Sequence, residues 1–169
     1  KRVGKKKKEA IQCVARINNT SYASFGEALT VAKATTGDVT VQIYDAVEFV
    51  NGMELKGGNY TSITFIGKSD DAKMTINQSA GGDYIEAHGK TVAFENIALA
   101  KANPQWSGNS GHMGNYFSIQ GGTATYTNCP FLNGACTSGG TATYNNCTFK
   151  NESEFGLWVY DDALVTGIF

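Results

Sequence analysis

The sequence predicts an all-β fold: a right-handed parallel β-helix (solenoid) with an N-terminal capping strand pair and one amphipathic helix. A short strand phrase with an aromatic residue recurs at steps of 29, 32 and 18 residues. Irregular steps of this size are typical of a solenoid, whose loops differ in length between equivalent strands. Composition agrees, because 20 glycines and only 17% charged residues are typical of a strand-rich chain with many tight turns.

Residues 1–10 form a basic tail or linker. Six of the first eight residues are Lys or Arg, whereas the chain beyond residue 9 carries eight basic and fourteen acidic residues. Because the basic run contains no aromatic side chain and the body is acidic, we expect a solvated segment and no nucleic-acid partner. No stretch of about 18 apolar residues occurs, so we expect no membrane insertion.

Residues 11–38 are expected to form an N-terminal cap. Two short strands separated by an Asn-Asn-Thr turn signal come first. Ser24 and Glu27 then match a capping box, and apolar residues at helical spacing predict a helix over 25–34. One face of this helix should close the exposed strand edges of the first coil. The side chains expected on that face are Phe25, Leu29 and Ala32.

Residues 39–169 are expected to form the coils, truncated at the C-terminus because the chain stops in an apolar run. Residues alternate within each repeated phrase, so one aromatic and its apolar neighbour face the core. Like side chains of successive coils should stack about 4.8 Å apart. The aromatic positions of this column are Phe65, Phe94, Tyr126 and Tyr144.

An asparagine column is the second sign of stacked coils. Asn96, Asn128 and Asn146 each lie two residues after a repeated aromatic residue. Stacked amides hydrogen-bond along a ladder, and Asn tolerates the left-handed conformation of a sharp corner. Cys129 and Cys147 directly follow two of these asparagines. We expect both to point into the core as small apolar groups, with no bond between them.

An antiparallel sandwich is the competing architecture. It requires two-residue hairpins, such as Asn-Gly, between strands of equal length. Only Asn51-Gly52 and Asn133-Gly134 offer such a turn. The repeated phrase also recurs in the same order, without a mirrored partner, and this order favours parallel coils.

The N-terminal part resembles a known family. The segment 14–29, VARINNTSYASFGEAL, and the following GDVTV at 37–41 are similar to the opening of pectate-lyase-like β-helix domains in surface proteins of Gram-positive bacteria. The resemblance covers residues 13–67 and, more loosely, the repeats to residue 160. It implies an extracellular, non-catalytic adhesin or stalk module of a longer secreted or cell-wall-anchored polypeptide, with a glycan or a surface protein as partner.

The same fold occurs in polysaccharide lyases and glycoside hydrolases, so a fragment of a carbohydrate-active enzyme is the alternative function. Such lyases use an Arg or Lys base, but the only arginines here, Arg2 and Arg16, precede the coils. The polygalacturonase motifs Asn-Thr-Asp, Gly-His-Gly and Arg-Ile-Lys are absent. Asp161 and Asp162 are the catalytic candidates of this alternative. Because adjacent carboxylates are usually turn residues, we expect no catalysis.

We also expect no cofactor and no metal site. Calcium is the one metal that the sequence leaves open, since carboxylates on neighbouring loops supply the oxygen ligands it prefers. Those carboxylates belong to Asp70, Asp71, Asp83 and Glu86.

The best candidate for a contact surface is the Gly-, Ser- and Asn-rich loop 101–116. Trp106, His112 and Tyr116 are its ring-bearing side chains, and such rings stack on a sugar face or dock a partner protein. The competing interpretation is that Trp106 folds back to cover the solenoid.

Overall fold

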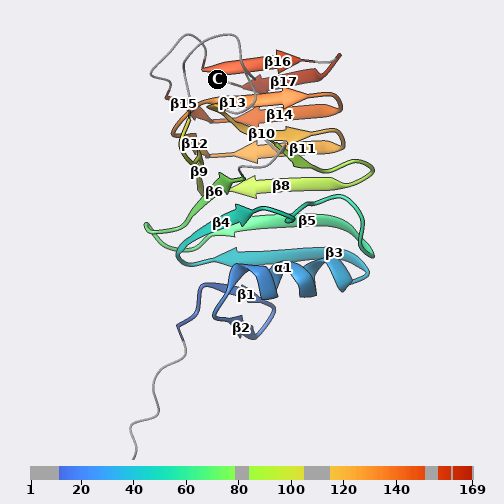
Figure 1. Cartoon of the computed structure of the whole chain (residues 1–169), viewed down its shortest axis with the longest axis vertical. Coiled ribbons are helices and arrows are strands. Elements are labelled where there is room, and N and C mark those ends of the chain that lie inside the picture. The colour runs from blue at the N-terminus through green and yellow to red at the C-terminus, as the bar shows by residue number, and fades with distance from the viewer. Residues whose placement is uncertain (1–11, 79–83, 105–114, 151–155, 161, 169) are drawn as a thin grey trace, which may run out of the picture.

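The computed structural model describes residues 12–78, 84–104, 115–150, 156–160 and 162–168. Within these ranges the chain is an all-β protein with one helix, and its strands form three sheets. The predicted basic tail, residues 1–10, lies outside the described residues. Figure 1 shows the strands of each sheet stacked along the long axis of the molecule, with the helix at the N-terminal end.

The N-terminal cap contains two antiparallel strands and the helix. β1 (Ala15–Ile17) and β2 (Thr20–Tyr22) pair antiparallel, and α1 follows as Phe25–Ala34, the range predicted. The Ser24 hydroxyl accepts a hydrogen bond from the Glu27 amide at 3.2 Å, as a capping box requires. The side chains that α1 buries are Phe25, Ala28, Leu29 and Ala32.

The largest sheet has eight strands, in the order β17-β14-β11-β8-β5-β3-β1-β2. Its strands beyond the cap are β3 (Gly37–Ile43), β5 (Tyr60–Gly67), β8 (Thr91–Glu95), β11 (Thr123–Thr127), β14 (Thr141–Asn145) and β17 (Leu164–Ile168). The first of these begins at residue 37, two residues before the predicted start of the coils.

Two smaller sheets complete the molecule. The five-stranded sheet contains β4 (Ala46–Val50), β6 (Lys73–Asn77), β9 (Ala98–Lys101), β12 (Pro130–Phe131) and β15 (Thr148–Phe149). The four-stranded sheet contains β7 (Ile85–Glu86), β10 (Phe117–Gln120), β13 (Ala135–Ser138) and β16 (Leu157–Tyr160).

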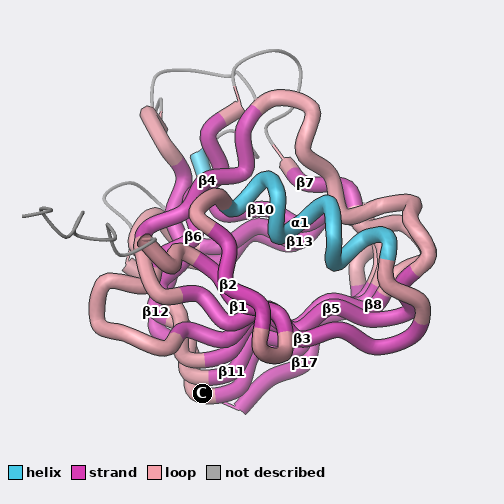
Figure 2. The backbone as a smooth tube through the Cα atoms, turned by 90° about the horizontal axis from the view of Figure 1, so that it is seen from below, coloured by secondary structure: helices cyan, strands magenta, loops and turns pink. Residues whose placement is uncertain are grey.

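From β5 onward, the chain visits the three sheets in a fixed rotation. Successive circuits therefore contribute neighbouring strands to each sheet. All strand pairs from β3 to β17 are parallel, so the antiparallel sandwich is excluded. Figure 2, seen from the N-terminal end, shows strands of one sheet lying over one another while α1 crosses the near end.

The aromatic column fills the centre of the described core. Phe65 pairs in register with Phe94, Phe94 with Tyr126, and Tyr126 with Tyr144. Their rings stack, with centroids 5.4, 5.2 and 4.8 Å apart. All four side chains are fully buried, so the rings of neighbouring circuits pack on one another.

At two corners, residues with positive φ recur in successive circuits and turn the chain from one sheet to the next. Asn96, Asn128 and Asn146 have φ of 52°, 53° and 52°, in the left-handed region that Asn tolerates. The Asn128 amide donates a hydrogen bond to the Asn96 side-chain oxygen at 3.1 Å. At another corner, Gly140 has φ of 68°, and a Cβ there would lie 2.3 Å from the Gly122 carbonyl oxygen. Glycine is therefore required before this repeated phrase.

Candidate functional site

The predicted ligand-binding residues do not form a described surface. Trp106 and His112 lie outside the described residues. Tyr116 is described and is only 3% exposed. A Cβ added at Gly134 would lie 3.0 Å from a Tyr116 ring carbon, so the ring packs against the backbone beside β13. In this position it does not present a face to solvent on which a sugar could stack.

The acidic pair of the enzymatic alternative lies between β16 and β17. Asp161 is outside the described residues. Asp162 is exposed and has φ of 54°, and the Ala163 amide donates to the Tyr160 carbonyl at 3.3 Å. Asp162 is thus a turn residue that joins two strands.

The four calcium candidates are not gathered into a metal site where the structure describes them. Asp83 lies outside the described residues, and Asp70 and Asp71 are exposed in a turn. Glu86 pairs instead with Lys56. Within the described ranges, no three His, Cys, Asp or Glu side chains are placed to hold a metal ion together.

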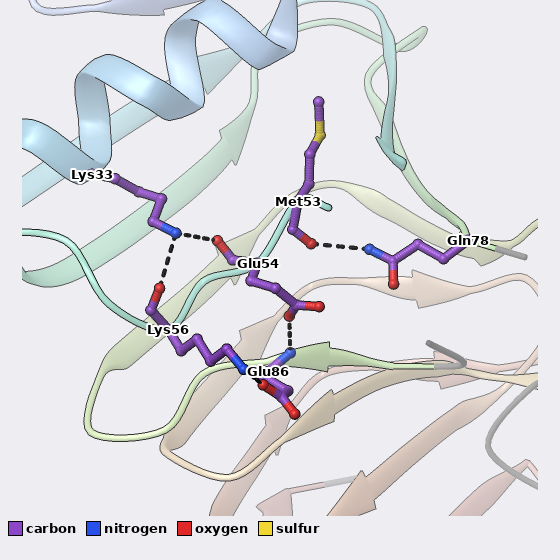
Figure 3. Close-up of polar contacts among 6 residues, drawn as sticks. All are labelled: Lys33, Met53, Glu54, Lys56, Gln78 and Glu86. Carbon is purple, nitrogen blue, oxygen red and sulfur yellow. Dashed lines mark hydrogen bonds and ion pairs between the residues drawn. The ribbon is translucent and has the colours of Figure 1, made fainter. Parts of the chain in front are cut away.

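Charged side chains do converge at another place, where the 51–59 loop between β4 and β5 lies near α1 and β7 (Figure 3). We call this group the charged cluster; it consists of Lys33, Glu54, Lys56, Glu86 and Lys90. Lys33 comes from the last turn of α1. Its ammonium donates to the carbonyls of Glu54 and Lys56, at 2.7 and 2.9 Å.

The other members of the charged cluster attach the same loop to β7 and β8. The Glu54 carboxylate accepts a hydrogen bond from the Glu86 backbone amide at 2.5 Å, and Lys56 forms an ion pair with Glu86. Lys90 donates to the Gly58 and Tyr60 carbonyls, at 3.1 and 2.6 Å, and lies 4.5 Å from the Tyr60 ring centroid. Lys33 and Lys90 therefore donate to backbone carbonyls of this segment, whereas the Glu86 amide of β7 donates to a side-chain carboxylate.

Partial burial changes the proton affinities in the charged cluster. Burial raises the pKa of Glu54, against the opposing effect of Lys56 and Lys33. Burial also lowers the pKa of Lys33, Glu54 opposes this, and the nearby Lys90 and Lys56 lower it further. The two carboxyls thus have different direct partners: Glu54 accepts from a backbone amide, whereas Glu86 pairs with the Lys56 ammonium.

Two carboxyls in unlike environments are the arrangement that glycoside hydrolases use as acid and base. Here, however, the Glu54 carboxylate is bonded to a backbone amide and that of Glu86 to Lys56. These contacts hold the 51–59 loop against β7, whereas Lys33 holds it against α1 of the cap. Sequence reasoning missed the cluster as a unit, because its members are 2 to 57 residues apart and only the fold brings them together.

The outer face of the eight-stranded sheet carries a row of hydroxyl groups. Register aligns Thr40 with Thr64, and aligns Thr125 with Thr143 and Thr166, while Ala93 of β8 lies between the two sets. The Thr143 and Thr166 hydroxyls are 3.0 Å apart. All five threonines are at least partly exposed, so the row is a polar surface that is interrupted at Ala93.

Comparisons with known proteins do not assign the chain to a family, because no family model, no curated protein and no solved structure matches it. Within the described residues, no helix has the length and apolar character needed to cross a membrane.

Proposed function

We propose that the chain is a right-handed parallel β-helix domain of a secreted or cell-wall-anchored surface protein, acting as a non-catalytic stalk or adhesin module. One observation supports this above all: successive circuits supply in-register parallel strands to three sheets. Right-handedness follows from the strong preference of parallel crossover connections for that hand. The resemblance of residues 13–67 to pectate-lyase-like surface domains supports the same proposal.

A stalk needs an axis that lengthens by addition of equal units. Each circuit adds about 4.8 Å along the stacking direction, and the buried ring stack links neighbouring circuits. Stability then comes from contacts between nearest neighbours. Loops at the corners vary in length without disturbing the strands, so surface features can be added to a constant frame.

The hydroxyl row is the contact surface that we assign to the adhesin role. Threonine hydroxyls donate and accept hydrogen bonds, and hydroxyl-rich glycans offer the complementary groups. The spacing of the row follows the strand spacing, so an extended polysaccharide has several equivalent contacts along it. Trp106 and His112, which lie outside the described residues, stay proposed contributors to binding.

The proposal is tested by applying the whole chain to a glycan array, with a reducing-end and unsaturated-product assay run on each glycan that binds. We expect binding without turnover. A Thr125→Lys/Thr143→Lys double variant should lose the binding. Thr148→Lys should keep it, because Thr148 is an exposed threonine on β15 of a different sheet. Absence of binding, or equal loss in both variants, would count against the hydroxyl row.

A carbohydrate-active enzyme is the second candidate function, favoured by the unlike environments of Glu54 and Glu86. Release of products from an acidic polysaccharide would replace the non-catalytic proposal. Loss of those products in Glu54→Gln would locate the chemistry in the charged cluster, and loss in Asp161→Ala would locate it at the turn between β16 and β17.

A further inference from the structure

Two cysteines occupy the same position in neighbouring circuits. Thr127 pairs with Asn145, and Pro130 pairs with Thr148. Both pairs join residues that are 18 apart, so the Cys129 strand position adjoins that of Cys147. Neighbouring strands are about 4.8 Å apart, which lies within the Cα separation of roughly 4.4–6.8 Å that a disulfide spans.

The thiol of Cys147 is already turned toward the circuit that contains Cys129. Its Sγ donates to the Tyr126 carbonyl at 3.6 Å, and Tyr126 belongs to that earlier circuit. It also forms a hydrogen bond with the backbone of Cys129. The Cys129 thiol repeats this arrangement one circuit lower, where its Sγ lies 3.3 Å from the Phe94 carbonyl oxygen. The two thiols therefore occupy one column in adjacent circuits, each turned toward the backbone of the preceding circuit.

Exposure determines which thiol meets an external oxidant first. Cys147 is half-buried, whereas Cys129 is only 1% exposed. Cys136 is equally buried but lies in β13 of the four-stranded sheet, where its strand partners are Ser118 and Trp158. All three thiols are free in this structure.

Contrary to the expectation from the sequence that no bond joins them, we propose that Cys129 and Cys147 are joined, by a disulfide oxidant such as oxidised glutathione, into a disulfide that links the two circuits. The Cys147 thiolate attacks one glutathione sulfur, forms a mixed disulfide and releases one glutathione thiolate, which takes up a proton. The Cys129 thiol then attacks the Cys147 sulfur, and its proton passes to the departing glutathione thiolate, which leaves as the second glutathione. Two protein thiols are oxidised and one glutathione disulfide is reduced.

This modification goes beyond the proposed function, because it depends on the stacking of the circuits and not on any ligand. The bond would close a loop of about 18 residues, which restricts the unfolded chain and stabilises the fold. The disulfide would form in oxidising environments, where disulfides persist, whereas the two thiols would stay reduced in a reducing compartment.

The experiment is mass spectrometry of the whole chain after incubation with oxidised glutathione at mildly alkaline pH, followed by chymotryptic digestion without reductant. Cleavage after Tyr126, Phe131, Tyr144 and Phe149 separates the two cysteines into peptides 127–131 and 145–149. We expect these peptides to be joined, with the mass of two hydrogen atoms lost. The Tm should rise by about 5–10 °C and return on reduction.

Cys136→Ser is the matched control and should keep both the linkage and the Tm rise, whereas Cys147→Ser should lose both. Peptides that stay separate in the wild-type chain, or linkage through Cys136, would overturn the proposal. If the linked protein shows no rise in Tm, the claim that the disulfide stabilises the two circuits would be overturned. None of these readouts depends on glycan binding, so failure of the proposed function would be seen separately.

Discussion

Two stacked tyrosines give a prediction in which the same substitution has opposite expected effects. The Tyr126 and Tyr144 rings are stacked, with centroids 4.8 Å apart and planes nearly parallel, at 9°, and both side chains are fully buried. The Tyr144 hydroxyl shares a 2.6 Å hydrogen bond with the Thr137 hydroxyl. One circuit earlier, Ile119 stands in the position of Thr137. The Tyr126 hydroxyl has no hydrogen-bond partner within the described part of the chain.

The hydroxyl of Tyr144 should therefore stabilise the fold, and that of Tyr126 should not. Tyr144→Phe leaves the buried Thr137 hydroxyl unsatisfied, which costs about 1–3 kcal/mol. Tyr126→Phe removes a buried polar group that lacks a partner, so the free energy of unfolding should stay the same or increase by about 1–2 kcal/mol. The two variants should thus differ by about 1–5 kcal/mol, although both keep the stacked ring.

Urea unfolding followed by circular dichroism measures this difference. A third variant, Ile119→Thr, gives Tyr126 the hydroxyl partner that Tyr144 has, so Tyr126→Phe should become destabilising in that background. Equal losses in the two tyrosine variants, or a larger loss at Tyr126, would refute the reasoning from hydrogen-bond satisfaction.

Three further predictions concern corners, the cap and alkaline pH. In urea titrations, Asn128→Ala should lower the free energy of unfolding by about 2–3 kcal/mol, because alanine is strained at positive φ and the side-chain hydrogen bond to Asn96 is lost. Asn128→Gly should cost less than half of that, since glycine adopts positive φ without strain. Equal costs for the two variants would contradict this explanation. In the same assay, Gly58→Ala should lower the free energy of unfolding by at least about 1 kcal/mol more than Gly57→Ala does. Both glycines have positive φ, but only a Cβ at position 58 would lie 2.6 Å from a backbone oxygen. Equal effects would argue against this contact. Burial raises the pKa of Cys129 to about 12 and of Cys136 to about 11, from 9.0, so the folded state keeps protons that the unfolded chain releases. Stability should fall as pH rises above 9, by about 1 kcal/mol per pH unit for each thiol, and Cys129→Ala should reduce the slope; an unchanged slope would exclude this cause.

Local signals in the sequence predicted the regular parts of the fold. The capping box fixed both the start of the helix at Phe25 and its polar contact. The repeated Thr-Ala-Thr-Tyr phrase predicted which residues face the core, since alternation along a strand depends only on neighbouring residues. The asparagines predicted the corners between strands for the same reason, because the left-handed backbone conformation depends on the type of one residue and not on distant contacts.

Features that depend on packing between distant segments were not predictable. Nothing near Lys33 indicates that its ammonium meets carbonyls of the 51–59 loop. Tyr116 was expected as an exposed platform, because loop composition reports turn chemistry but not whether a ring lies against the backbone at Gly134. The missing partner of Tyr126 likewise depends on which side chain the four-stranded sheet places opposite it.

The direct test of the central claim is the register of β11 against β14, measured by interstrand nuclear Overhauser effects in solution. Parallel stacking predicts backbone contacts that join Thr123 to Thr141 and Thr127 to Asn145, together with contacts between the Tyr126 and Tyr144 rings. An antiparallel pair would instead join Thr123 to Asn145 and Thr127 to Thr141, and that result would contradict the stacked-circuit account.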